Sequence, residues 1–346
     1  MATCLLGLGS NLGDRVGILS RAAEQLRQHP QVEHVLVSRW HAYPPIGGPQ
    51  GQGEFLNGAA RLETSLSPEE LRRLLHELER RAGRERVIRW AERPLDIDLL
   101  LYDDRQIHTA ELQVPHPRMA TRRFVLEPAA EVAGPMIDPQ TGWSISRLWQ
   151  HLQSAPPYFA LAGIYLPALA ASGPCVAQRV KAVYLADSSG AGLTGPAEPD
   201  RLEFYRERCR KLQRSLRRGL DQAAGGQPLL SGFWVGQCEI EGAWLAAERR
   251  ADARSEREAG MQPIRLEIAH WAVPKLVIVL RTTADMLRDE FVAPWIRKLP
   301  TSARSALQDA IGRVHRGSAE SPALVLDVAA DFSPIDDIVA AVEAMR

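Results

Sequence analysis

The chain has 346 residues, of which 45% are hydrophobic and 24% are charged. Its 42 Lys and Arg residues balance 42 Asp and Glu residues, so the formal net charge is zero. This balance argues against a general nucleic-acid-binding or anionic-membrane-binding protein, and the composition excludes a largely disordered chain. No run of about eighteen apolar residues occurs, so no membrane span is expected. The opening apolar segment lacks a basic leader and is expected to be a first strand, which predicts a cytoplasmic protein.

At roughly 100–200 residues per domain, the length predicts two domains, with a linker at residues 153–158. The elements expected in the first domain, in chain order, are a strand at 3–9, a helix at 15–28, a strand at 32–40, a long loop at 42–54, a strand at 55–64, a helix at 68–82 that starts with a capping box at Ser67, a strand at 95–104, a short helix within 114–133 and a helix at 144–152. This order, without a GxGxxG motif, favours an α+β sandwich on a mixed or antiparallel sheet.

In the second half, charged and amphipathic helices alternate with continuous apolar strands, the pattern of a three-layer α/β domain with a parallel sheet. The elements expected there are helices at 201–223, 239–258 and 334–345 and strands at 274–283 and 322–329. Four scattered cysteines form no CxxC pair, so neither a zinc site nor a disulfide framework is expected.

Two aspartates separated by one residue, Asp96 and Asp98, are the most distinctive feature of the first half. In the predicted strand 95–104 they point to the same face, with Cβ atoms roughly 6–7 Å apart. A Mg²⁺ ion usually takes one or two protein carboxylates and completes its coordination with phosphates and water. The pair could therefore hold two ions around one triphosphate. The alternative is an acidic strand face exposed to solvent.

Basic residues flank this acidic pair. Arg84 and Arg93 precede it, Arg122 follows it, and His116 lies between two prolines. Guanidinium groups match phosphate oxygens in bidentate pairs, and metal-binding carboxylates combined with arginines are typical of phosphoryl transfer. Taken singly, each arginine could be a solvent-exposed charge and His116 a rigid turn residue.

Two aromatic residues, Phe55 and Phe124, lie next to predicted loops. Their rings could sandwich a flat heterocycle, and Asn57, on the same strand face as Phe55, could form hydrogen bonds to its edge. The alternative is that both rings belong to the hydrophobic core.

Residues 1–152 resemble the 6-hydroxymethyl-7,8-dihydropterin pyrophosphokinases of folate biosynthesis over the full length of that family's domain. The resemblance rests on the segments GLGSNLGDR (7–15), YPPIG (43–47), FLN (55–57), LERRAGR (78–84), RPLDIDLLLY (93–102) and VPHPRMATRRFVLEP (114–128). It implies a ferredoxin-like α/β sandwich on an antiparallel sheet, and a reaction in which ATP donates its β,γ-diphosphate to the pterin hydroxymethyl group and AMP is released.

The same resemblance implies a role for individual residues. Asp96 and Asp98 would hold two Mg²⁺ ions, while Arg84 and Arg93 would neutralise the transferring group. The residues expected to contact ATP are Glu79, His116, Arg122 and Trp90, the last on a loop that closes over the substrates. The residues expected to contact the pterin are Tyr43 and Ile46 through backbone groups, Phe55 and Phe124 by stacking, and Asn57 by hydrogen bonds.

Two positions depart from the family pattern. Ala91-Glu92 stands where a Gly-Pro pair is usual, which changes the stiffness of the arginine loop and places a carboxylate beside Arg93. Tyr43 replaces a usual threonine. Both departures concern loop geometry and rate rather than the identity of the reaction.

Residues 159–346 resemble, more faintly, the deoxynucleoside-kinase branch of the P-loop kinases. The phosphate-binding motif G-x-x-x-x-G-K-[ST] is missing, because Gly163 is followed by Ile-Tyr-Leu-Pro-Ala-Leu. We therefore expect a kinase-like domain without catalysis, which could form a homodimer.

The sequence thus predicts an ATP-dependent pterin diphosphokinase with small-molecule substrates and no nucleic-acid or membrane partner. The alternative is a catalytically impaired pterin- and ATP-binding protein or scaffold, which the degenerate second half and Glu92 favour.

Overall fold

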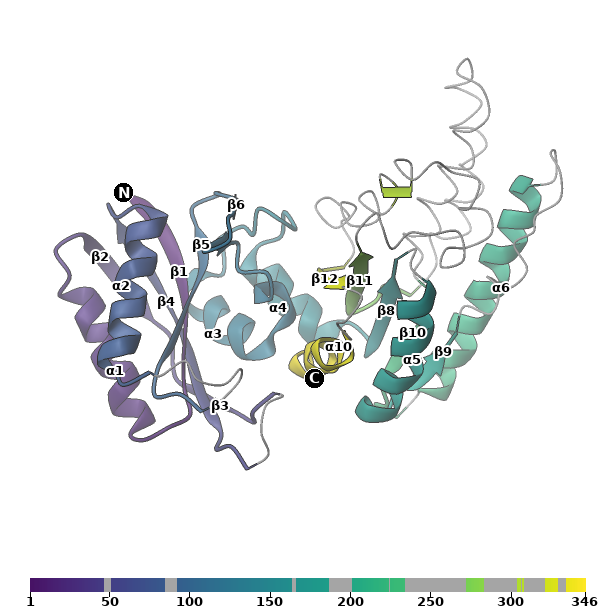
Figure 1. The fold of residues 1–346 in the computed structure, drawn as a ribbon, viewed down its shortest axis with the longest axis horizontal. Helices are drawn as coiled ribbons and strands as arrows, with labels where there is room; N and C mark the ends of the chain where they lie inside the picture. The colour runs from purple at the N-terminus through teal and green to yellow at the C-terminus, as the bar shows by residue number, and fades with distance from the viewer. Residues whose placement is uncertain are drawn as a thin grey trace, which may run out of the picture. The chain divides into compact units, whose positions relative to one another are not determined.

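The computed structural model describes residues 1–46, 51–84, 92–163, 166–186, 201–223, 225–233, 272–282, 304–305, 307, 321–328 and 334–346. The chain divides into two compact units, Met1–Ser154 with Glu343–Arg346, and Ala155–Val342 (Figure 1). The change of unit after Ser154 falls inside the predicted linker 153–158. The C-terminal residues 343–346 group with the first unit, a detail that the sequence did not indicate.

The N-terminal unit is an antiparallel sheet with helices. Its elements are β1 (Ala2–Ser10), α1 (Arg15–Arg27), β2 (Val32–Val37), β3 (His41–Tyr43), β4 (Phe55–Thr64), α2 (Pro68–Arg81), β5 (Asp96–Tyr102), β6 (Ile107–His108), β7 (Gln113–Val114), a 3-10 turn (Met119–Thr121), α3 (Arg123–Ala133) and α4 (Ile145–Ser154). The strand order is β2-β4-β1-β5, with β3 also paired to β4 and β6 paired to β7 in a separate ribbon. The expected antiparallel α/β arrangement is therefore confirmed.

Helices α1 and α2 begin at capping residues that the sequence supplies. The Asp14 side chain accepts a hydrogen bond from the Gly17 amide at the start of α1. At the start of α2, Ser67 and Glu70 form the predicted capping box, with Pro68 as the first helical residue. These caps satisfy amide groups that have no partner within the helix, so each helix begins at a defined residue.

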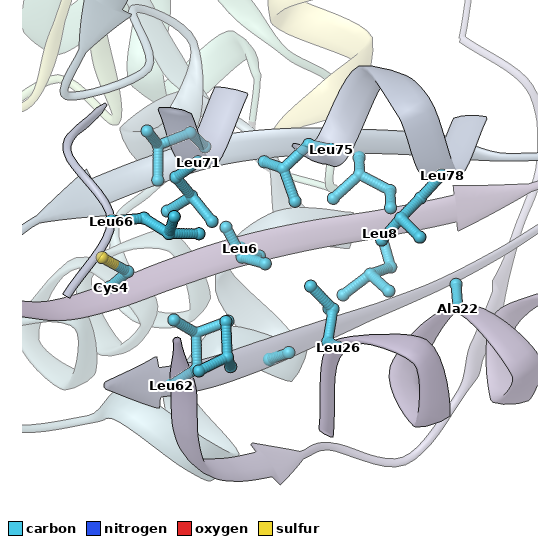
Figure 2. Packing of buried hydrophobic residues seen from close by; sticks show 14 of the residues in the cluster. Cys4, Leu6, Leu8, Ala22, Leu26, Leu62, Leu66, Leu71, Leu75 and Leu78 are labelled. Atoms are coloured by element: carbon cyan, nitrogen blue, oxygen red, sulfur yellow. The ribbon is translucent and has the colours of Figure 1, made fainter. Parts of the chain in front are cut away.

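A leucine-rich core fills the space between the sheet and these two helices (Figure 2). Alternate residues of β1, such as Leu6 and Leu8, point into it and meet Leu71, Leu75 and Leu78 of α2. The intervening β1 residues therefore point to the opposite face of the sheet, because side chains alternate along a strand. That opposite face carries the candidate site.

The predicted strand 32–40 is interrupted in the structure. It ends at Val37, and a second strand, β3, begins at His41 and pairs with the first residues of β4. Between the two, the Trp40 ring packs on Gly58, where an added Cβ would overlap the indole. The long predicted loop therefore begins after Tyr43 rather than at residue 42.

The second unit contains a five-stranded parallel sheet with order β12-β11-β8-β10-β9. Its described elements are β8 (Tyr158–Ala162), α5 (Leu166–Val180), β9 (Val183–Leu185), α6 (Arg201–Gln222), β10 (Leu229–Ser231), β11 (Leu276–Thr282), β12 (Ala323–Val328) and α10 (Ile335–Ala344), whose last two residues group with the first unit. β11 lies between two strands and is almost completely buried, as its apolar sequence predicts. The helix expected at 239–258 lies outside the described residues.

No helix among the described residues is long and apolar enough to cross a membrane.

Candidate active site

The predicted carboxylate pair lies on one face of β5. Asp96 is in register with Gly9 of β1, and Asp98 is in register with Gly7. Ile97 and Leu99, which alternate with the aspartates, belong to the leucine-rich core on the opposite face. The aspartate side chains are 25% and 38% exposed, so they are accessible but not freely solvated. The alternative expectation, an acidic strand face fully exposed to solvent, does not agree with this partial burial.

Two arginines converge on Asp96. Arg84 Nη1 lies 2.6 Å from Asp96 Oδ1, and Arg93 Nη1 lies 3.0 Å from Asp96 Oδ2. Their side chains are only 15% and 20% exposed, so neither is an ordinary surface charge. The arrangement gathers two fixed positive charges next to the carboxylates, where a polyphosphate would need them.

Glu79 of α2 contacts both this cluster and the backbone of β5. It extends from α2, its side chain is 4% exposed, and it accepts a hydrogen bond from the Ile97 amide at 2.8 Å. It also forms an ion pair with Arg84. Among the described strands, β5 lies at the end of the order β2-β4-β1-β5, and its Ile97 amide donates to Glu79 of α2. The structure thus gives Glu79 a supporting role; its predicted contact with ATP is untested.

His116 faces the second carboxylate. Its amide donates to Leu100 O at 2.9 Å, and its Nδ1 accepts from the Arg118 amide at 3.1 Å. The other ring nitrogen, Nε2, faces Asp98 Oδ2 at a distance of 3.8 Å. The bond between Val114 and Pro115, directly before His116, is cis.

The charges of the cluster displace the pKa values of its members. Burial and the neighbouring Asp98 raise the pKa of Asp96, against the effect of the arginines. For Asp98, burial alone would raise the pKa, but His116 and the arginines together lower it. Burial lowers the pKa of His116 despite the attraction of Asp98, and burial also lowers that of Arg122. Asp98 therefore remains a carboxylate while His116 tends to the neutral form.

The residues expected to bind a heterocycle lie beside the carboxylates on the same sheet face. Asn57 of β4, Gly9 of β1 and Asp96 of β5 are in register across three strands. Gly9 contributes no side chain between them, and an added Cβ there would lie 3.0 Å from Asn57 Oδ1. With strands about 4.8 Å apart, Asn57 and Asp96 are separated by roughly 10 Å, about the width of a small ligand.

Aromatic rings gather at the adjoining end of this face. Phe55 is the cross-strand partner of Tyr43. The Tyr43 and Phe124 rings are 6.2 Å apart between centroids, and the Arg122 guanidinium lies 5.4 Å from the Phe124 ring. Phe55 and Phe124 are only partly buried and lie outside the leucine-rich core, so the interpretation of both as core residues is wrong.

Asn11, which sequence reasoning did not single out, joins two loops of the site. Its Oδ1 accepts from the Arg93 amide at 2.8 Å, its own amide donates to Arg93 O at 3.2 Å, and its Nδ2 donates to Gln52 Oε1 at 3.3 Å. Glu92 accepts from the Gly53 amide at 3.4 Å. The Glu92 carboxylate, which departs from the family pattern, thus contacts the neighbouring loop. For Asn11, the only signal in the sequence was its place in the turn after β1.

Two further residues were predicted to belong to the site, Ile46 and Trp90. Ile46 is half-buried at the start of the loop after β3. Trp90, like Ala91, lies outside the described residues. Within the part of the chain that the structure describes, no three His, Cys, Asp or Glu side chains form a group that could hold a metal ion.

An antiparallel α/β sheet, a carboxylate pair, converging arginines and adjacent aromatic rings form the combination expected of a protein that transfers phosphoryl groups to a flat ring compound. The sequence model of the 7,8-dihydro-6-hydroxymethylpterin-pyrophosphokinase family matches residues 5–134. The chain is 36% identical over 162 residues to 2-amino-4-hydroxy-6-hydroxymethyldihydropteridine pyrophosphokinase of Synechocystis sp., covering 47% of this chain and 82% of that protein.

The pyrophosphokinase of Bacillus subtilis is 44% identical over 127 residues, which are 37% of this chain and 75% of that protein. That of Aquifex aeolicus is 39% identical over 140 residues, which are 40% of this chain and 85% of that protein. The chain belongs to the 7,8-dihydro-6-hydroxymethylpterin-pyrophosphokinase family.

Among solved structures, a deoxyadenosine kinase from M. mycoides with bound dATP aligns with 53% of this chain and 96% of its own, at 12% identity and a TM-score of 0.35.

Proposed function

We propose that the N-terminal unit transfers the β,γ-diphosphate of ATP to the hydroxymethyl group of 6-hydroxymethyl-7,8-dihydropterin and releases AMP, a step of folate biosynthesis. The observation that carries the proposal is the convergence of Arg84 and Arg93 on Asp96. Asp96 and Asn57 lie on either side of Gly9, which has no side chain to fill the space between them. Family membership supports the substrate class, and the position of Asn57 in register with Asp96 supports the proposed sites for the two substrates.

We further propose that Asp96 and Asp98 hold two Mg²⁺ ions. Their donor chemistry fits, because carboxylate oxygens are the ligands that Mg²⁺ takes from proteins, usually one or two for each ion. When bound, the ions would neutralise charge on the triphosphate. The His116 ring lies beside Asp98, with its Nε2 3.8 Å from Asp98 Oδ2, within the range of an electrostatic interaction with that carboxylate.

The arginines do the remaining electrostatic work. A guanidinium has five N–H donors, so Arg84 and Arg93 can bond to phosphate oxygens while they remain next to Asp96. Asn11 holds the Arg93 backbone through two hydrogen bonds, which limits the movement of that side chain. Phosphoryl transfer depends mainly on positioning and charge neutralisation, and this is what these residues provide.

The pterin would lie between the rings of Phe55 and Phe124, with its edge toward Asn57 and its hydroxymethyl group toward the carboxylates. Backbone groups of Tyr43 and Ile46, Trp90 on its loop, and ATP contacts from Glu79, His116 and Arg122 complete the proposed site. The position of Asn57 in register with Asp96 supports this orientation.

The finer description of the fold is also a proposal. The order β2-β4-β1-β5, with α1 between β1 and β2 and α2 between β4 and β5, supports a ferredoxin-like sandwich for the domain at 1–152. The parallel sheet and the missing phosphate-binding motif support a three-layer, kinase-like domain without catalysis at 159–346. A homodimer through that domain and a cytoplasmic location stay predictions.

The proposal is tested by measuring AMP release from ATP and Mg²⁺ with and without 6-hydroxymethyl-7,8-dihydropterin. We expect AMP to form only with the pterin. ATP binding without AMP would favour the impaired pterin- and ATP-binding protein, and Ala91-Glu92 would be the first residues to exchange. ADP formed with a nucleoside acceptor would show that the second unit is the kinase.

A further inference from the structure

A ladder of polar contacts joins β3 to α3 beside the proposed pterin site. Tyr43 donates its hydroxyl hydrogen bond to Glu127 Oε2 at 2.5 Å, and His41 Nε2 lies 2.9 Å from Glu131 Oε1. His41 Nδ1 lies 4.0 Å from Glu127 Oε1, so the two contacts are linked. At the outer end, Arg39 Nη2 is 2.8 Å from Glu131 Oε1.

The spacing of the two elements explains why both contacts form together. Residues two apart on a strand are separated by about 6.6 Å, and residues four apart on a helix by about 6 Å along its axis. Tyr43 therefore lies opposite Glu127, and His41 lies opposite Glu131. Three of these side chains, those of His41, Glu127 and Glu131, are between 19% and 27% exposed, so solvent screens the contacts only partly.

The ladder contacts both sides of the proposed pterin site. On β4, the cross-strand partners of His41 and Tyr43 are Asn57 and Phe55, the residues proposed to bind the edge and one face of the pterin. On α3, the first turn carries Phe124, the ring proposed for the other face, whose centroid is 6.2 Å from that of Tyr43.

We propose that Tyr43 and Glu127, with His41 and Glu131, are positioning residues that fix the separation between the two sides of the pterin site. The inference rests on the proposed function. It gives the Tyr43 side chain a task beyond the backbone contact expected of that position. With the ladder closed, the ring of Phe124 is held in place before the pterin arrives, so binding does not have to order it.

The test compares Tyr43→Phe and Glu127→Gln with the wild-type chain in steady-state assays of AMP release, varying each substrate in turn. We expect KM for the pterin to rise about tenfold, which corresponds to roughly 1.4 kcal/mol, while KM for ATP and the melting temperature change little. The double variant Y43F/E127Q should be no worse than the poorer single variant, because Tyr43→Phe removes the same charge-assisted hydrogen bond that Glu127→Gln weakens.

Glu77→Gln is the matched control, since Glu77 forms exposed ion pairs with Arg80 and Arg81 on α2; its kinetic constants should equal those of the wild type. An active wild-type enzyme whose pterin KM is unmoved in both variants overturns the positioning proposal alone. Additive effects of the two changes, or an equal rise in both KM values, overturn it as well. A wild-type chain that forms no AMP with the pterin overturns the proposed function instead.

Discussion

Replacement of Glu79 by Ala should destabilise the N-terminal unit and weaken catalysis together. The Glu79 side chain is 4% exposed, and its contacts within the described part of the chain include the Ile97 amide at 2.8 Å and the Arg84 guanidinium. Truncation would leave the amide of a buried residue without its acceptor, a loss of about 1–3 kcal/mol. It would also remove one of the carboxylates beside Arg84.

The free-energy cost of losing the Glu79–Arg84 ion pair depends on the partners that Arg84 retains. Breaking a buried ion pair typically costs about 3–5 kcal/mol. Arg84 retains Asp96 at 2.6 Å and is 15% exposed, so the cost should fall well below that range. The free energy of unfolding of the N-terminal unit should therefore decrease by about 3 kcal/mol in Glu79→Ala. Glu79→Gln keeps an acceptor for Ile97 and should lose about half as much.

The measurement is urea denaturation followed by far-UV circular dichroism, combined with hydrogen exchange of the peptide that contains Ile97. Exchange at this amide should accelerate in Glu79→Ala more than at the amides of β1. Glu77→Gln, which changes an exposed carboxylate on the same helix, should behave as the wild type. If Glu79→Ala unfolds at the wild-type urea concentration with unchanged exchange at Ile97, the supporting role of Glu79 is refuted.

The structure supports three further predictions, on Asp98, Glu131 and Cys4. Asp98→Asn should lower turnover by about 10³-fold or more, because a carboxylate proposed to hold metal is lost; AMP release measures this. Hydrogen bonds from Arg39 and His41 outweigh burial and lower the pKa of Glu131 to about 2. Since the folded-state pKa is below the ordinary 4.5, the stability that Glu131 adds is complete above that value and is lost as the pH falls toward 2. Burial raises the pKa of the Cys4 thiol to about 12, so at pH 8 Cys4 should resist iodoacetamide while exposed Cys175 is alkylated.

Each of these outcomes has a contrary result. Wild-type turnover in Asp98→Asn would remove that carboxylate from the proposed metal site. The Glu131 prediction compares urea denaturation of wild type and Glu131→Gln from pH 6 to pH 2.5, and a stability difference that stays constant across this range contradicts it. Mass spectrometry of alkylated peptides measures the thiols, and equal rates at Cys4 and Cys175 in the folded protein would show that Cys4 is accessible.

Elements whose signals are local in the chain were predicted well. β4 spans the predicted residues 55–64, and α2 begins at the predicted capping box. The strand predicted at 32–40 failed at one point, because Trp40 packs on Gly58 and ends the pairing of β2 with β4. That contact joins residues distant in sequence, and no periodicity in the segment itself could reveal it.

The site shows the same division. The shared face of Asp96 and Asp98 follows from the period of a strand, and the arginines were recognised by residue type and proximity in the chain. Contacts across long separations were not recognised. Arg93 and Asn11 are 82 residues apart, Tyr43 and Glu127 84, and His41 and Glu131 90. In the sequence, Glu127 and Glu131 are ordinary helix-surface carboxylates.

The sequence by itself therefore determined the antiparallel and parallel classes of the two sheets, the helix starts, the acidic pair and the family resemblance. The helix starts and the acidic pair depend on residue type and spacing within a single element, whereas the antiparallel class of the first sheet follows from the order of elements and the family resemblance. Only the tertiary structure decided that Asp96 receives two arginines, that Glu79 completes the edge of β5, and that β3 is fixed to α3. These contacts depend on which elements the chain brings together, and side chains with few local preferences, such as Glu, take their partners from that packing.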